Sequence, residues 1–175
     1  NYNGVSVPVT FQYTVYLAKY SPTSVFQWVK YKEDITCPFA QVAANTPDEV
    51  YLSSQLWDDM PFEGITLEGP IAGGADFFIA KFNASGTVQW IKELQGEGSV
   101  VQGSQNFLET DSQGNVSFVG EFRGNINWGV QTTTSIGTSY DAIFLKYNAA
   151  GNLLFAKTAN SEHQERFDSV VTDSE

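Results

Sequence analysis

One block of residues occurs three times in this chain, and this repeat constrains the fold more than any other feature. The two clearest copies are Asp76–Lys92 and Asp141–Lys157, and a weaker copy is Thr14–Lys30. Each has a lysine after an apolar run, then a short polar stretch and an aromatic residue two positions before a final lysine. The first lysine of each block recurs after 62 and then 65 residues, at Lys19, Lys81 and Lys146. A near-constant period indicates stacked units of similar structure.

Each block predicts a β-hairpin. Residues 76–83 are rich in aromatic and branched side chains, Asn83–Gly86 is typical of a tight turn, and residues 87–94 form the returning strand. A second predicted hairpin lies between blocks, with strands at Asn106–Asp111 and Val116–Gly120. No segment has the period of a helix. One unit therefore has four strands.

The order of these strands divides the chain. We expect eleven strands. The first two are the third and fourth strands of one unit, the next eight form two whole units, and the last, at Ser169–Asp173, is the first strand of a further unit. A Gly-, Ser- and Thr-rich loop is expected after the second strand of each whole unit, where Trp128-Gly129 echoes Phe62–Gly64. The predicted boundaries are a partial blade at 1–33, blades at 34–95 and 96–160, and the start of a further blade at 161–175.

The apolar pattern predicts how the sheets pack. Phe77–Ala80 is apolar on both strand faces, whereas a sheet with one wet face alternates more cleanly. Small sheets covered on both faces without helices are typical of a β-propeller. The predicted fold class is all-β: an incomplete propeller of four-stranded antiparallel blades, two complete, with a partial blade at each end. The residues expected to be well buried are Phe77, Ile79, Trp90, Phe118 and Val119.

These residues resemble a known family. Asp76–Lys92, followed by Asp111–Val116, resembles the SBBP β-propeller repeat, and Gly120–Gly129 is similar to the glycine-rich segment of that family. The resemblance covers residues 14–175, and the first copy departs from the pattern at Thr14, Ser24 and Asp48-Glu49. It implies a propeller, usually of about seven blades, in secreted and cell-surface proteins of bacteria. It implies an extracellular or surface location and no shared catalytic residues.

Composition argues against several partners. The net charge is −11 with only nine basic residues, six of them at repeat positions, so nucleic acid is not expected as a partner. No apolar run approaches 18 residues, so no membrane insertion is predicted. Cys37 is the single cysteine, which excludes an internal disulfide, and we expect an inert thiol. The first residue is Asn1, so we expect further blades of a longer polypeptide, or a partner chain, to cover the open ends.

Recurring polar and aromatic positions each have two interpretations. Asp76 and Asp141 could bind a cation or sugar, but accepting backbone hydrogen bonds at a turn is the favoured role. The aromatic position could be a sugar platform, but packing in the core is favoured; its members are Trp28, Trp90 and Phe155. The repeated lysines are expected to protect exposed strand edges and aid solubility; these are Lys81, Lys146, Lys92 and Lys157.

Other groups give weaker signals. Asp58-Asp59, or Glu93 with Glu97, could act in glycoside hydrolysis only if two carboxyls face each other across a cleft. His163 with Glu162 and Glu165 is a weak metal pattern, and a solvated loop is favoured. The glycosylation-type sequences Asn83-Ala-Ser85 and Asn115-Val-Ser117 coincide with turns and are interpreted as turn chemistry.

The predicted function follows from these alternatives. We expect a non-catalytic, secreted or cell-surface β-propeller module that acts as a scaffold or binds protein or glycan. The alternatives are an accessory region of a secreted polysaccharide-active enzyme and a propeller glycoside hydrolase. No catalytic, metal-binding or cofactor-binding residue and no cofactor are assigned, and the ligand-binding residues stay unassigned.

Overall fold

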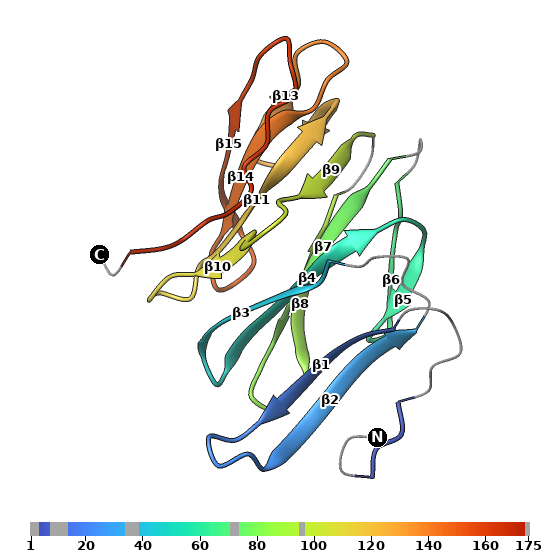
Figure 1. Cartoon of the computed structure of the whole chain (residues 1–175), viewed down its shortest axis with the longest axis vertical. Coiled ribbons are helices and arrows are strands. Elements are labelled where there is room, and N and C mark those ends of the chain that lie inside the picture. The colour runs from blue at the N-terminus through green and yellow to red at the C-terminus, as the bar shows by residue number, and fades with distance from the viewer. Residues whose placement is uncertain (1–3, 8–13, 34–38, 71–73, 95–96, 174–175) are drawn as a thin grey trace.

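Three layers of antiparallel strands follow one another along the long axis of the molecule (Figure 1). The computed structural model describes residues 4–7, 14–33, 39–70, 74–94 and 97–173. Within these residues the regular secondary structure is β-strand and the paired strands are antiparallel, which confirms the predicted all-β class. The first layer is a hairpin, and the other two are larger sheets.

The first two layers have the predicted strand order. The hairpin pairs β1 (Thr14–Tyr20) with β2 (Phe26–Glu33). The first sheet runs in the order β3 (Gln41–Thr46), β4 (Glu49–Leu56), β7 (Asp76–Phe82) and β8 (Val88–Glu93). The small hairpin β5 (Met60–Phe62) with β6 (Ile65–Leu67) is inserted between β4 and β7. Sequence neighbours are thus sheet neighbours, as in a meander.

The second sheet repeats this order with one difference. It runs through β10 (Leu108–Thr110), β11 (Val116–Arg123), β14 (Asp141–Tyr147) and β15 (Leu153–Ala159). A further strand, β9 (Ser99–Gln102), also pairs with β11, so β9 and β10 lie along the same edge of β11. The inserted hairpin joins β12 (Asn125–Asn127) to β13 (Thr132–Thr134).

The three repeated hairpins close in the same way. Asn83 Oδ1 accepts hydrogen bonds from the N–H groups two and four residues ahead, at 3.1 and 2.9 Å, and Asn148 Oδ1 does the same at 3.0 and 2.9 Å. In the weak copy the Ser21 hydroxyl takes this place, at 3.3 and 3.1 Å. The last turn residue has a left-handed φ in each copy: 62° at Ser24, 77° at Gly86 and 82° at Gly151. Glycine suits this conformation and serine tolerates it poorly.

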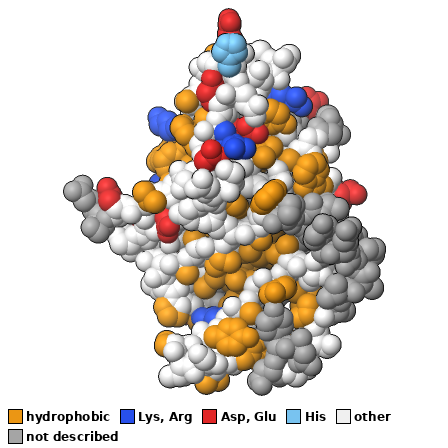
Figure 2. All heavy atoms as spheres, viewed as in Figure 1, with side chains coloured by type: hydrophobic (Ala, Val, Ile, Leu, Met, Phe, Trp, Pro, Cys, Tyr) orange, Lys and Arg blue, Asp and Glu red, His pale blue; other side chains and the backbone are white. Residues whose placement is uncertain are grey.

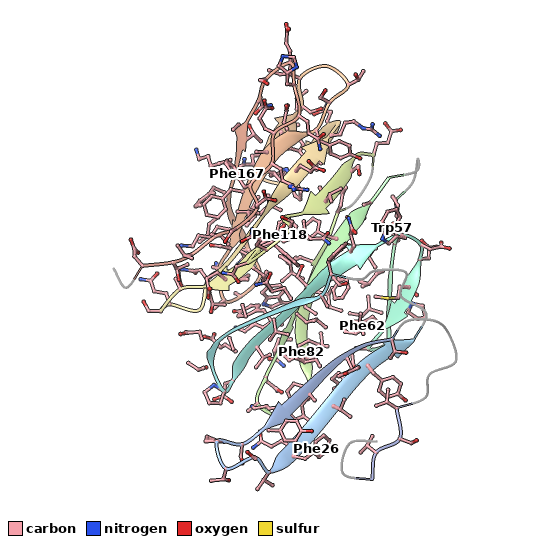
Figure 3. All side chains as sticks on the ribbon, in the orientation of Figure 1. Phe26, Trp57, Phe62, Phe82, Phe118 and Phe167 are labelled. Carbon is pink, nitrogen blue, oxygen red and sulfur yellow. The ribbon has the colours of Figure 1, made fainter. Side chains whose placement is uncertain are left out.

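Two cores lie between the three layers. Alternate side chains of β7 point to opposite faces, so Phe77 and Ile79 pack toward the second sheet, while Phe78 and Phe82 pack toward the β1–β2 hairpin. Phe77 stacks on Phe118 of the second sheet, with ring centroids 4.6 Å apart. Figure 3 labels Phe82 and Phe118, one from each core. This explains why the strands are apolar on both faces.

The predicted core is confirmed at four positions and corrected at one. Phe77, Ile79, Phe118 and Val119 are buried. Trp90 is only half-buried, because β8 is the outermost strand of its sheet.

The expected set of eleven strands is also corrected. The Gly-, Ser- and Thr-rich loops contain the hairpins β5–β6 and β12–β13, which strand-length patterns did not reveal. The innermost strand of the second sheet is split, because Gly103 and Phe107 exchange separate backbone hydrogen bonds with Val119. Ser169–Asp173 forms no strand. Val170 N donates to the carbonyl of Asn106, a single bond where a strand needs a ladder.

Candidate functional site

The repeated tryptophans tie neighbouring layers together. Trp28 Nε1 donates to the carbonyl of Ala84 at 2.8 Å, and Trp90 Nε1 donates to that of Ala149 at 3.1 Å. Each indole also lies on the glycine of that turn. A Cβ atom would approach Trp28 to 2.8 Å at Gly86, and Trp90 to 3.0 Å at Gly151. We call each of these a Trp–turn contact. Both indoles are engaged in packing, as the favoured interpretation predicts, and neither is a free platform.

The first lysine of the first two repeats also donates to these turns. Lys19 Nζ donates to the carbonyls of Pro47 at 2.6 Å and Ala84 at 3.2 Å. Lys81 Nζ donates to the carbonyl of Ala149 at 2.8 Å and pairs with Glu49 at 2.9 Å.

The prediction that Lys81 protects an exposed edge is therefore wrong. Its exposed fraction is 7%, because its ammonium satisfies a carbonyl of the neighbouring layer and a carboxylate of its own. Lys146 pairs with Asp111 at 2.8 Å. Lys157 is exposed on β15, where the edge interpretation remains.

The repeated aspartates are buried acceptors of backbone hydrogen bonds. Asp76 Oδ1 accepts from the N–H groups of Phe77 at 2.6 Å and Leu94 at 3.3 Å. Asp141 accepts from Ile136 N at 2.6 Å and Ser161 N at 3.4 Å. Burial raises the pKa of Asp76 to about 8, although the two N–H donors oppose the shift. Both positions fit the predicted structural role.

The other carboxylate candidates also bond to nearby backbone. Asp58 Oδ1 accepts from Asp59 N at 2.8 Å, and Asp59 Oδ1 accepts from Gly69 N at 2.9 Å. Glu93 Oε2 accepts from Glu68 N at 2.9 Å, and Glu97 is exposed. Burial raises the pKa of Glu93, with the charges of Glu68 and Asp59 adding to the effect.

The loop around His163 does not gather ligands. His163 is exposed, and the Ser161 hydroxyl contacts Glu165. Among the described residues no group of three or more His, Cys, Asp or Glu side chains could hold a metal ion. Asn83 and Asn115 serve their turns, the latter by donating to Asp111 Oδ2 at 2.7 Å. Cys37 lies outside the described residues.

One cleft lies between the outer parts of the two sheets. Its volume is about 620 Å³, and β8, the β12–β13 hairpin and the β14–β15 turn form its walls. Its polar lining includes Lys92, Asn127 and Asn152, and its aromatic lining includes Trp128 and Tyr147. Burial raises the pKa of Tyr147, which keeps its hydroxyl protonated at neutral pH. The cleft therefore has hydrogen-bonding side chains beside aromatic ones.

Glu93 also lines the cleft, next to Lys92 in the sequence, but the two side chains point in different directions. Lys92 pairs with Ile79 across the sheet, whereas Glu93 pairs with Phe78, so their side chains leave β8 on opposite faces. Only Lys92 is on the face toward the second sheet. Sequence reasoning placed Lys92 on an edge strand and saw Trp128 as an echo of Phe62, but it did not bring these two residues to one site.

Surface charge and comparison with known proteins give little further information about the cleft. On the face in Figure 2, Lys and Arg side chains are few and separated rather than gathered in a patch. The described part of the chain contains no helix that could span a membrane. Comparison with protein-family models found no match, and a search of curated proteins also found none.

Proposed function

We propose that this chain is part of a β-propeller of the SBBP-like kind, in which each four-stranded sheet is a blade. The Trp–turn contact is the observation that carries this proposal. It joins the hairpin to the first sheet and the first sheet to the second through equivalent residues. A contact that repeats with the sequence generates a regular stack, and twisted sheets packed in this way close into a ring.

The third residue at the repeated aromatic position makes no Trp–turn contact. Phe155 occupies the place of Trp28 and Trp90, and it packs edge-to-face on Phe144 at 5.1 Å. Both lie on the face of the second sheet turned away from the first, which we call the outer face. The described residues contain no fourth hairpin of this kind to sit against Phe155. Further blades or a partner chain would complete the contact.

The same proposal includes a non-catalytic role, as a scaffold or binding module of a secreted or cell-surface protein. The carboxylates considered for hydrolysis accept backbone hydrogen bonds that hold loops in place. A glycoside hydrolase needs a second carboxyl opposite the first. The wall of the cleft opposite β8 presents Asn127, Trp128 and Asn152 instead. A protein or glycan ligand is the class that suits these side chains.

Affinity electrophoresis through gels containing different polysaccharides would test the binding role. We expect retardation by at least one polysaccharide, with no release of reducing ends from it. Hydrolysis that is lost in Glu93→Gln would instead favour the enzyme. The absence of both retardation and hydrolysis would contradict a glycan-binding role.

An experimental structure that includes residues on both sides of this chain would test the propeller. We expect the sheets to surround an axis, with Phe155 against the turn of the next sheet. A straight stack, or a solvent-exposed Phe155 in that structure, would contradict the proposal.

A further inference from the structure

The place equivalent to this cleft, one layer earlier, contains an ion pair. Lys30 of β2 pairs with Glu63 of the β5–β6 turn at 2.8 Å. The equivalent lysine is Lys92 of β8, because both follow their repeat tryptophan by two residues. The β12–β13 hairpin occupies the place of β5–β6 in the next repeat. Phe62 corresponds there to Trp128, but the β5–β6 turn has two residues, Glu63 and Gly64, whereas Trp128–Gln131 joins β12 to β13 and contains no carboxylate.

The second copy thus keeps the lysine and lacks the acid. Among the described residues no carboxylate pairs with Lys92, and no hydrogen bond engages its ammonium. A Cβ atom placed on Gly151 would lie 3.1 Å from Lys92 Cε, so the lysine stem rests on the turn glycine at the cleft wall. The ammonium is therefore held beside the cleft rather than on a freely extended side chain.

Two further polar groups beside the cleft have no described partner. The side-chain amide of Asn152 and the hydroxyl of Tyr147 make no hydrogen bond within the described residues. Asn127 Oδ1 accepts from Gly129 N at 2.8 Å, which orients its amide but leaves the NH₂ group without a described acceptor. The indole of Trp128 adds an apolar surface, with its N–H satisfied by Thr133 at 2.9 Å. An ammonium, a phenol, amides and an indole together match a polar ring with one acidic group.

We propose that this cleft binds a glycan through a single carboxylate-bearing sugar residue, such as a uronic acid. The carboxylate takes the place that Glu63 occupies in the preceding repeat and pairs with Lys92. Asn152 and Tyr147 bond to ring hydroxyls, and the apolar face of the sugar lies against Trp128. The proposal rests on the binding role given above and names its ligand.

The charge of the chain favours one acidic group over many. The net charge of −11 repels polyanions at long range, whereas a single carboxylate close to Lys92 gains a local attraction. An acidic peptide is the competing ligand. An extended peptide needs an open strand edge, and the Gln131 side chain already donates to the Ala156 carbonyl of β15 at 2.6 Å. This hydrogen bond occupies part of the β15 edge, so we favour a sugar over a peptide as the ligand.

Titration of the ¹⁵N-labelled 175-residue chain with methyl β-D-glucuronide, followed by NMR, tests this assignment. Shifts are expected at the Lys92, Gly129 and Asn152 amides, with at least tenfold weaker binding of methyl β-D-glucoside. Lys92→Gln should reduce glucuronide affinity at least tenfold. Lys30→Gln is the matched control and should leave it unchanged, because Lys30 already pairs with Glu63.

A second pair of variants restores the acid of the preceding repeat. Gly129→Glu should place a carboxylate beside Lys92 and abolish glucuronide binding, while Gly129→Ala should retain it. Both carry the same backbone strain, since Gly129 has a φ of 88° and no atom lies within 4 Å of a Cβ there. Glu63 has a φ of 49°, so the turn of the preceding hairpin already holds a glutamate in a left-handed conformation.

Several outcomes would overturn the assignment. Equal affinity for glucuronide and glucoside, unchanged binding in Lys92→Gln, or no shifts with either sugar would each do so. Tighter binding of an acetylated Glu-Gly-Glu peptide than of the glucuronide would replace the sugar by an acidic peptide. Failure at this cleft while polysaccharide gels still retard the chain would leave the binding role intact. Hydrolysis that depends on Glu93 would instead contradict the non-catalytic binding role.

Discussion

The indole nitrogen of Trp90 lies 3.1 Å from the carbonyl oxygen of Ala149, and this hydrogen bond joins two different sheets. Trp90 also contacts the ring of Tyr51, with centroids 5.7 Å apart, and that of Tyr147, at 6.5 Å. One side chain therefore combines a polar bond between layers with aromatic packing on both sides. The same polar bond one layer earlier joins Trp28 to Ala84.

Trp90→Ala should lower the free energy of unfolding by about 2–4 kcal/mol, near the lower end for a large aromatic because Trp90 is half-buried. Trp90→Phe should cost about 1–2 kcal/mol, because it keeps ring packing and loses the indole hydrogen bond. Urea titrations followed by circular dichroism give both values. A change below about 0.5 kcal/mol for the alanine variant would show that the Trp–turn contact contributes little.

Ser24→Gly should stabilise the chain by about 0.5–1 kcal/mol. Ser24 has a φ of 62°, a left-handed conformation that costs serine more than glycine. Gly86→Ala is the opposite change at the equivalent position and should be destabilising, since its Cβ would also come within 2.8 Å of Trp28. Thermal melts of both variants check the signs. A destabilised Ser24→Gly would mean that the serine side chain contributes more than the backbone strain costs.

The Asp76 carboxyl should make stability fall as the pH rises from about 4 to about 8. Burial raises its pKa to about 8 in the folded chain, from an ordinary value of 3.8. The folded state therefore holds a proton there that the unfolded state releases, and each step up in pH favours unfolding across this window. Asp76→Asn should flatten this part of the profile, measured by urea unfolding at several pH values. An unchanged slope in the variant would assign the dependence to other groups.

The Asp111 carboxyl should have the opposite effect on the pH dependence of stability, so it serves as a control. Burial acts to raise its pKa, but bonds from Lys146 and Asn115 outweigh it and lower the pKa to about 2. The contribution of Asp111 to folding stability is present when the pH is above the pKa of this carboxyl in the unfolded chain. It is lost as the pH falls from about 4 to 2. Asp111→Asn should therefore change the acid side of the profile and leave the pH 4 to 8 slope in place.

The outer face of the second sheet should make the isolated chain associate. Phe144 and Phe155 are half-buried there, and Leu154, in the bulge next to Phe155, is 49% exposed. An apolar face without a partner favours self-association and binding of hydrophobic dyes. Phe155→Lys should reduce both, as measured by analytical ultracentrifugation and dye fluorescence. A monomeric wild-type chain that melts cooperatively and binds no dye would contradict the incomplete-propeller proposal.

Local features of the fold could be predicted from the sequence because they depend on residues close together in the chain. The Asn-x-x-Gly turns close through side-chain bonds two and four residues ahead, as at Asn83 and Asn148. Runs such as Phe77–Ala80 are apolar on both strand faces, which indicates sheets covered on both sides. The repeat period also indicated that Asp76 and Asp141 have one shared structural role.

The small hairpins and the split strand could not be predicted in this way. β5–β6 and β12–β13 have three-residue strands, too short for alternation to be recognised. Between β9 and β10, Gly103 N donates to the Val119 carbonyl and Val119 N donates to the Phe107 carbonyl, across the sheet. Neither pattern is visible without the partner strand.

The sequence by itself determined the all-β class, the order of strands within each sheet and the turns that join them, because these depend on local conformational preference and alternation. Only the tertiary structure decided which repeated residues share an environment. Lys81 is buried because its ammonium donates to the Ala149 carbonyl of the next layer, whereas Lys92 of the same repeat faces a cleft and has no such partner among the described residues. Lys30 pairs with Glu63 of the β5–β6 turn, whereas no described carboxylate of the β12–β13 turn pairs with Lys92. That pairing depends on packing between layers rather than on any local pattern.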